Sequence, residues 1–139
     1  MKVDVSRVDV WVAGIDDQPG GLAEKLDILA QADVDLEFII ARRSSSTPGH
    51  GVVFVTPIKG PRQIRAARKV GFEKTKSLHA IRVATGNKPG FSAELTKKLA
   101  EAGINLRGFS GATIGNRAAI YLGFDSDADA GKALRLLNK

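Results

Sequence analysis

The side chains of this chain that could do acid–base or metal chemistry begin with two histidines. His50 lies between two glycines, and His79 starts a predicted strand. Neither stands in a nucleophile or metal-binding motif, so we assign both a structural or solvent role. The 139 residues include no cysteine, which excludes disulfides, zinc–thiolate sites and cysteine nucleophiles. We predict that the chain is not an enzyme and needs no cofactor or metal.

The carboxylates and hydroxyls lead to the same prediction. Asp125, Asp127 and Asp129 are spaced like the start of a calcium loop, but the required glycine and closing glutamate are missing. These residues lead into a predicted helix, where carboxylates favour the N-terminus. The serines at 44–46 have no base that the sequence identifies. These residues therefore indicate no catalytic or calcium site.

Two Pro–Gly turns, at residues 17–20 and 87–90, carry polar groups just before predicted helices. Amides exposed at such a turn and at the start of the next helix attract a carboxylate. Asn87 offers both a donor and an acceptor. Glycines at 20, 21 and 90 let the backbone approach a ligand. The alternative is that both turns only start helices, with Asp17 and Asn87 chosen for turn propensity.

These turns belong to an internal repeat. Residues 17–36 align without a gap on residues 87–106, at an offset of 70. The identical pairs are Pro19/Pro89, Gly20/Gly90, Ala23/Ala93, Glu24/Glu94, Leu29/Leu99, Ala30/Ala100, Ala32/Ala102 and Leu36/Leu106. The identities cluster at a turn, a helix and the following strand, so we interpret the chain as a duplication.

Each copy predicts the same series of elements. The first has strands at 8–12, 34–42, 52–58 and 72–78, and helices that follow Gly20 and Gly60. The second has strands at 79–84, 104–114 and 118–124, and helices at 91–102 and 127–137. This order indicates an α+β fold of two ferredoxin-like βαββαβ repeats, each an antiparallel sheet with both helices on one face.

The second copy lacks its last strand, which leaves a sheet edge open. Proteins usually cover such an edge. Residues 2–5 are a candidate cover, because the alternation of Val3 and Val5 breaks at Ser6-Arg7 before Val8. A partner chain is the other candidate. We predict domains at 1–77 and 78–139, with no flexible linker, and a homodimer.

The repeat resembles the ACT domain family, on the strength of residues 87–106 and their counterpart 17–36. The resemblance covers residues 8–137. It implies a regulatory module that binds an amino acid at the junction of two domains, between the loop after strand one and the start of strand two. Matching positions place the ligand contacts at Asn87, Lys88, Gly90, Phe91 and Ser92, at Asp17, Gln18, Gly20, Gly21 and Leu22, and at Asp35, Leu36, Asn105 and Leu106.

The two predicted sites are not equal. Asp17 stands where the family pattern has Asn, and its carboxylate would repel a ligand carboxylate while suiting an amine. We therefore favour the Asn87 site. We expect selectivity to depend on Phe91, Ser92, Ser110 and Thr113.

The net charge of +6 leaves nucleic acid or a protein partner as alternatives. Six cations and only one carboxylate, Glu73, lie in residues 62–76, which is either a solvated face or a docking surface. The RNA-recognition motif has the same order of elements, with stacking aromatics on strands one and three. Trp11 and Phe54 take such positions, but the second copy has only Tyr121. We therefore interpret Trp11 and Phe54 as packing residues and do not favour nucleic acid.

The surroundings of the protein are the last prediction from sequence. No apolar run approaches the roughly 18 residues that a membrane span needs. The first residues alternate valine with charged residues, unlike a signal peptide. We expect a cytoplasmic protein with no membrane partner.

Overall fold

The computed structural model describes residues 2–138 and divides the chain into two compact units. Residues Asp9–Thr75 form one of them, called here the inserted unit. The other, called here the terminal unit, consists of the chain up to Val8 together with the chain from Lys76 onward. Each unit has its own sheet and its own hydrophobic core.

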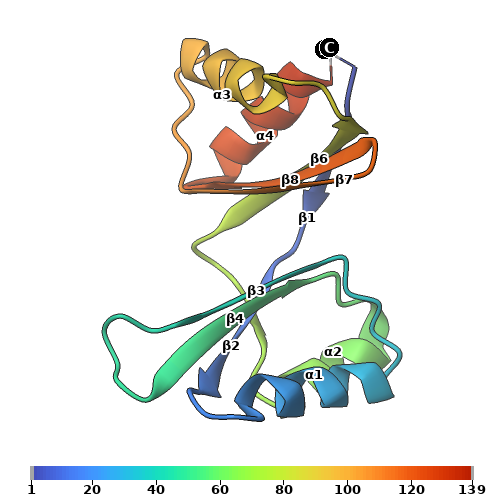
Figure 1. The fold of residues 1–139 in the computed structure, drawn as a ribbon, viewed down its shortest axis with the longest axis vertical. Coiled ribbons are helices and arrows are strands. Elements are labelled where there is room, and N and C mark those ends of the chain that lie inside the picture. The colour runs from blue at the N-terminus through green and yellow to red at the C-terminus, as the bar shows by residue number, and fades with distance from the viewer. Residues whose placement is uncertain (1, 139) are drawn as a thin grey trace. The chain divides into compact units, whose positions relative to one another are not determined.

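The inserted unit contains one complete βαββαβ series. Its elements are β2 (Trp11–Asp16), α1 (Gly21–Gln31), β3 (Phe38–Arg43), β4 (His50–Thr56), α2 (Gly60–Lys69) and β5 (Glu73–Lys74). The antiparallel sheet has the order β3-β4-β2-β5, with both helices on one face (Figure 1). Trp11, Val53, Val55 and Phe72 are buried between this face and the helices. The predicted ferredoxin-like plan is confirmed.

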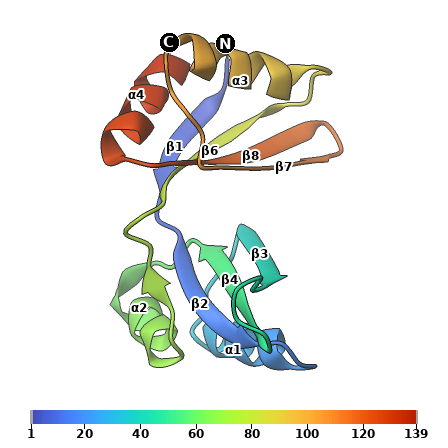
Figure 2. The same ribbon diagram turned by 90° about the vertical axis from the view of Figure 1, so that its left-hand side faces the viewer.

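The terminal unit repeats this plan with one strand from the other end of the chain. Its elements are β1 (Asp4–Val8), β6 (His79–Gly86), α3 (Phe91–Glu101), β7 (Gly108–Ile114), β8 (Arg117–Phe124) and α4 (Asp127–Leu137). The sheet order is β1-β6-β8-β7, and α3 and α4 cover one face (Figure 2). β1 lies beside β6, the place that β5 takes beside β2. The N-terminal strand therefore supplies the fourth strand that the second repeat lacks.

The N-terminal strand continues past the break in alternation at Ser6-Arg7, where the predicted cover at residues 2–5 ended. β1 continues to Val8, and the chain leaves the sheet at Asp9 and Val10. Val3 and Val5 pack against the core of the terminal unit, and Arg7 follows them on the same face. The charge on this face is tolerated because Arg7 forms an ion pair with Asp127 of α4. Val8 consequently belongs to β1, and the first strand of the inserted unit begins only at Trp11.

The second strand of each repeat starts later than predicted. After α1, Asp33 adopts a φ of 60°, and the N–H of Val34 donates to Leu29 O at 3.1 Å. After α3, Gly103 has a φ of 75°, and Ile104 donates to Leu99 O at 3.0 Å. Both are Schellman helix ends, which place an apolar residue just after the left-handed residue. Val34 and Ile104 therefore pack at helix ends instead of starting strands.

Candidate functional site

The loop from β6 to α3 begins the candidate site, and its shape follows from a glycine. Gly90 has a φ of 81°, a left-handed conformation that glycine adopts without strain. It allows Phe91 N–H to donate to Lys88 O at 3.1 Å and starts α3 with the bond from Glu94 N–H to Gly90 O at 3.0 Å. The N–H of Asn87 donates to Asn116 O at 2.7 Å, in the turn between β7 and β8. This bond holds the loop beside the end of that hairpin.

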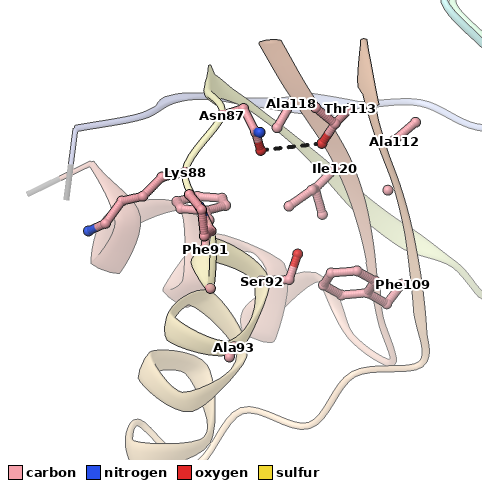
Figure 3. A pocket seen from close by; sticks show the side chains of 13 residues that line it. Asn87, Lys88, Phe91, Ser92, Ala93, Phe109, Ala112, Thr113, Ala118 and Ile120 are labelled. Atoms are coloured by element: carbon pink, nitrogen blue, oxygen red, sulfur yellow. Dashed lines mark hydrogen bonds between the residues drawn. The ribbon is translucent and has the colours of Figure 1, made fainter. Parts of the chain in front are cut away.

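A pocket of about 370 Å³ lies between this loop, the start of α3 and strands β7 and β8 (Figure 3). Its volume falls in the range of small-ligand sites, roughly 300–1,000 Å³. It is lined by Asn87, Lys88, Pro89, Gly90, Phe91, Ser92, Ala93, Phe109, Gly111, Ala112, Thr113, Ala118 and Ile120. The structure therefore brings five predicted residues, Asn87, Lys88, Gly90, Phe91 and Ser92, to one cavity.

One end of the pocket is polar. Thr113 Oγ1 donates to Asn87 Oδ1 at 3.4 Å, which is long for a hydrogen bond between these groups (Figure 3). The Nδ2 end of the Asn87 side chain takes no part in this hydrogen bond. Both residues are exposed, so this pair can exchange its contact for one with a ligand. Ser92 adds a hydroxyl from the first turn of α3.

The walls of the pocket are apolar. Phe91 and Ile120 are buried, whereas Phe109 on β7 keeps 41% of its surface exposed. A Cβ on Gly111 would lie 3.3 Å from Ile120 Cγ1. The missing side chain at Gly111 therefore keeps the floor of the pocket open between Phe109 and Thr113.

Lys88 is the one charged residue among those that line the pocket. Its Nζ lies 3.7 Å from a carboxylate oxygen of Glu94, and Figure 3 shows its side chain running away from Ile120 and Phe109. The lining includes no carboxylate. The pocket can therefore offer amide, hydroxyl and backbone groups to polar atoms, and hydrocarbon to the rest of a ligand.

The counterpart residues in the inserted unit have other surroundings. Gly20 repeats the left-handed turn with a φ of 88°, and Gln18 O accepts from Gly21 N–H at 3.0 Å. Asp17 forms an ion pair with Arg43 at 3.0 Å. Leu22 packs against the core. Gly21 lines a smaller cavity of about 130 Å³ with Gly14, Ile15, Asp16, Glu24, Lys25 and His50.

The predicted contacts at Asp35, Leu36, Asn105 and Leu106 do not join either cavity. Leu36 and Leu106 pack against the cores of their own units. Asn105 precedes the start of β7, whereas Asn87 contacts Thr113 near its end, about 17 Å further along the strand. Of the two further selectivity residues, Thr113 lines the pocket, while Ser110 lies on the other face of β7.

Sequence reasoning missed the strand side of the pocket, namely Phe109, Gly111, Ala112, Ala118 and Ile120. Their alternation along β7 and β8 was visible in the sequence. The part of these strands that α3 leaves uncovered depends on how the helix packs on the sheet, which the sequence does not show. One signal was available: a large phenylalanine and a glycine alternate on the predicted strand at 104–114, where glycine otherwise weakens a strand.

Two arginines of the basic segment at 62–76 contact other parts of the inserted unit. Arg62 donates to Ala32 O and Gln31 O, both at 3.1 Å, and to Asp33 at 3.0 Å. Arg68 lies over the ring of Trp11, 5.7 Å from its centroid. Trp11 itself is only 3% exposed, which confirms its packing role and removes it as a base-stacking surface.

The acidic residues before α4 also have structural partners. Ser126 caps the helix by accepting from Asp129 N–H at 3.1 Å. Asp125 lies 3.3 Å from Arg107, and Asp127 pairs with Arg7. Among residues 2–138, no group of three His, Asp or Glu side chains is placed to hold a metal ion. Within the same range, no helix is long and apolar enough to cross a membrane.

Comparison with known proteins gives matches among solved structures. Neither a protein-family model nor a curated protein matches the sequence. Protein BT0572 from Bacteroides thetaiotaomicron is 13% identical, with a TM-score of 0.79 over 96% of this chain and 90% of that one. The ligand-free regulatory subunit of aspartate kinase from Thermus thermophilus is 19% identical, with a TM-score of 0.64 over 99% and 95%. The corresponding subunit from Thermus flavus is 20% identical, with a TM-score of 0.60 over 99% and 94%.

The chain has the tandem ACT fold. These matches span nearly the whole of each chain, so the likeness includes both repeats and the N-terminal strand. At identities of 13% to 20%, the likeness of this chain to the regulatory subunits shows the fold alone. What the chain binds must be argued from its own residues.

Proposed function

We propose that this chain is a non-enzymatic regulatory module that binds an amino acid in the pocket at Asn87. One observation carries the proposal: the loop after β6, the start of α3 and strand β7 enclose a pocket with polar groups at one end and apolar walls. Backbone amides at the turn and at the start of α3 suit the carboxylate of an amino acid. The side-chain oxygens of Asn87 and Thr113 suit its ammonium group.

The position of the pocket supports a binding site at a junction between ACT domains. β7 is an edge strand of its sheet. It carries Phe109 and Ile114, which are 41% and 82% exposed. An edge strand with exposed apolar side chains favours pairing with another chain. We infer that a second copy covers this edge in a homodimer and borders the pocket.

Regulation would follow from differential binding. A ligand shifts a protein between two states only if it binds them with different affinity. An amino acid that contacts both the loop at Asn87 and edge strand β7 would favour one arrangement of that edge. A protein that recognises the edge in this arrangement would sense the amino acid. Nucleic acid is not favoured, because Arg62, Arg68 and Trp11 are engaged in packing.

The test is thermal unfolding of the purified chain with each of the twenty amino acids, followed by calorimetric titration of those that shift the transition. A ligand at about 100 times its Kd adds roughly 2.7 kcal/mol, which is several degrees for a chain of this size. Thr113→Ala should reduce the affinity, and Ser110→Ala is the matched control, since Ser110 lies on the other face of the same strand. A shift by none of the amino acids, with a salt-sensitive shift by an oligonucleotide, would replace this proposal with the nucleic-acid alternative.

A further inference from the structure

The two repeats share several backbone hydrogen bonds at equivalent positions, which fixes which positions correspond. Glu24 N–H donates to Gly20 O at 3.0 Å, and Glu94 N–H donates to Gly90 O at 3.0 Å. The loop before each helix is tied to the opposite hairpin in the same way: Asp17 N–H bonds Gly49 O, as Asn87 N–H bonds Asn116 O. Position 17 is therefore the structural equivalent of position 87.

The strand side of the site corresponds in the same manner. Arg43 is opposite Gly51 in the pairing of β3 with β4, and Thr113 is opposite Ala118 in the pairing of β7 with β8. Arg43 and Thr113 therefore hold equivalent places, 70 residues apart. The same two places are joined in both units, but by different chemistry. Thr113 and Asn87 share a hydrogen bond of 3.4 Å, whereas Arg43 Nε and Asp17 Oδ2 form an ion pair at 3.0 Å.

The wall beside this contact also differs. Ser92 lines the pocket of the terminal unit and is exposed. Its equivalent, Leu22, packs against the core of the inserted unit. Gly21 takes the place of Phe91, and a Cβ there would lie 2.1 Å from Asp16 O. The backbone at Asp16 therefore lies too close to Gly21 for an aromatic side chain like that of Phe91 to fit there.

We propose that the inserted unit occupies its own copy of the site with Arg43, so that each chain binds one ligand, in the terminal unit. This inference rests on the proposed function. Asp17 presents a carboxylate where Asn87 presents an amide, and a carboxylate attracts the cationic end of an amino acid. The Arg43 guanidinium already satisfies it through a charge-assisted bond.

Arg43 is part of the same chain as Asp17 and therefore competes with any free ligand for this carboxylate. A group tethered by a short segment competes at an effective concentration on the order of millimolar. A free amino acid at lower concentration would have to remove Arg43 from Asp17 and leave the guanidinium without its partner. In the terminal unit a ligand replaces only the long bond between Asn87 and Thr113. Arg43 therefore links loop and strand in one repeat, and the ligand makes the equivalent link in the other.

The test exchanges the two pairs between the repeats and uses the full chain. The probe is whichever of the twenty amino acids binds the wild-type protein, and calorimetry gives its stoichiometry. We expect one ligand per chain. The double variant Asn87→Asp/Thr113→Arg, which transfers the ion pair to the terminal unit, should lose at least tenfold in affinity while its circular dichroism stays that of the wild type. The double variant Asp17→Asn/Arg43→Thr should keep the wild-type affinity of the Asn87 pocket within about twofold.

Two results would overturn the inference. One is a stoichiometry of two per chain for the wild type. The other is loss of binding in Asp17→Asn/Arg43→Thr with the fold intact, because Arg43 would then contact the ligand directly. If the wild-type chain binds none of the twenty amino acids, the proposed function itself fails, and this is seen before any variant is made.

Discussion

Arg7 on β1 and Asp127 in the first turn of α4 form an ion pair across 120 residues of sequence. Arg7 donates a hydrogen bond to the Asp127 carboxylate, and this bond, reinforced by the charge of Arg7, lowers the pKa of Asp127 below its ordinary value of 3.8. The pair ties the N-terminal strand to the last helix of the same unit. It also places a negative charge at the start of α4, where the helix dipole favours it.

The lowered pKa of Asp127 predicts part of the acid sensitivity of the fold. Because the folded state prefers ionised Asp127, this carboxylate stabilises the protein above its unfolded pKa, and the stabilisation is lost as the pH falls through its folded pKa. Asp127→Asn should therefore unfold more readily than the wild type at neutral pH, and this difference should shrink below about pH 4. Urea unfolding at a series of pH values measures it. Asp125→Asn is the control, since it removes a neighbouring carboxylate that contacts Arg107 instead of β1.

The N-terminal strand should be necessary for the terminal unit. Val5 packs against the core, so Val5→Asp would bury an unpaired charge and should cost at least about 2 kcal/mol of unfolding free energy. Ser6→Asp introduces the same charge on the other face of β1, opposite Arg82 in the pairing with β6. It should change stability by less than about 0.5 kcal/mol. Equal effects of the two substitutions in urea denaturation would mean that β1 does not pack as described.

Substitution of Arg62 should mainly lower the stability of the folded protein. Its guanidinium satisfies the last carbonyls of α1, so Arg62→Ala should lower the unfolding free energy by about 1–2 kcal/mol. Arg65→Ala, on the same helix, should cost less than about 0.5 kcal/mol, because this side chain is exposed. If a protein partner or an oligonucleotide binds residues 62–76, Arg65→Glu should reduce the amount recovered in a pull-down. If Arg62→Ala leaves stability unchanged and Arg65→Ala lowers it, the capping role is wrong.

Gly111 should control access to the pocket. A valine there suits a strand and would project between Phe109 and Ile120, since the glycine Cα faces Ile120 in the cavity. Gly111→Val should weaken amino-acid binding at least tenfold and leave the thermal transition of the free protein within a few degrees. Ser110→Val, which adds a side chain of the same size on the opposite face, should bind normally in calorimetry. Normal binding by Gly111→Val would place the ligand elsewhere.

Most of the fold could be predicted because the duplication repeats its local signals. Gly20 and Gly90 start equivalent helices, and residues 127–137 form the helix that their pattern indicates. The errors have local causes. Arg7 interrupts an apolar alternation because a distant residue neutralises it, and Val34 and Ile104 are apolar because helix ends use them. Neither cause can be read from neighbouring residues.

The candidate site was predictable on its loop side and not on its strand side. Asn87 and Gly90 belong to a turn whose chemistry is local. Phe109 and Ile120 reach the same pocket only through the pairing of β7 with β8 and the position of α3 over the sheet. The ion pair of Asp17 with Arg43 was also hidden, because it joins two segments through the pairing of β3 with β4.

The place of β1 in the sheet determines which of the two units can fold first during synthesis. β1 ends at Val8, but its partner β6 begins only at His79, after every element of the inserted unit has been made. At a synthesis rate of about 5–20 residues per second, the ribosome reaches β6 roughly 4 to 14 seconds after it has completed β1. The inserted unit has all four of its strands by then, so it can fold first. Asp4 and Arg7 place charges on the waiting strand, which discourages it from pairing with a neighbouring nascent chain.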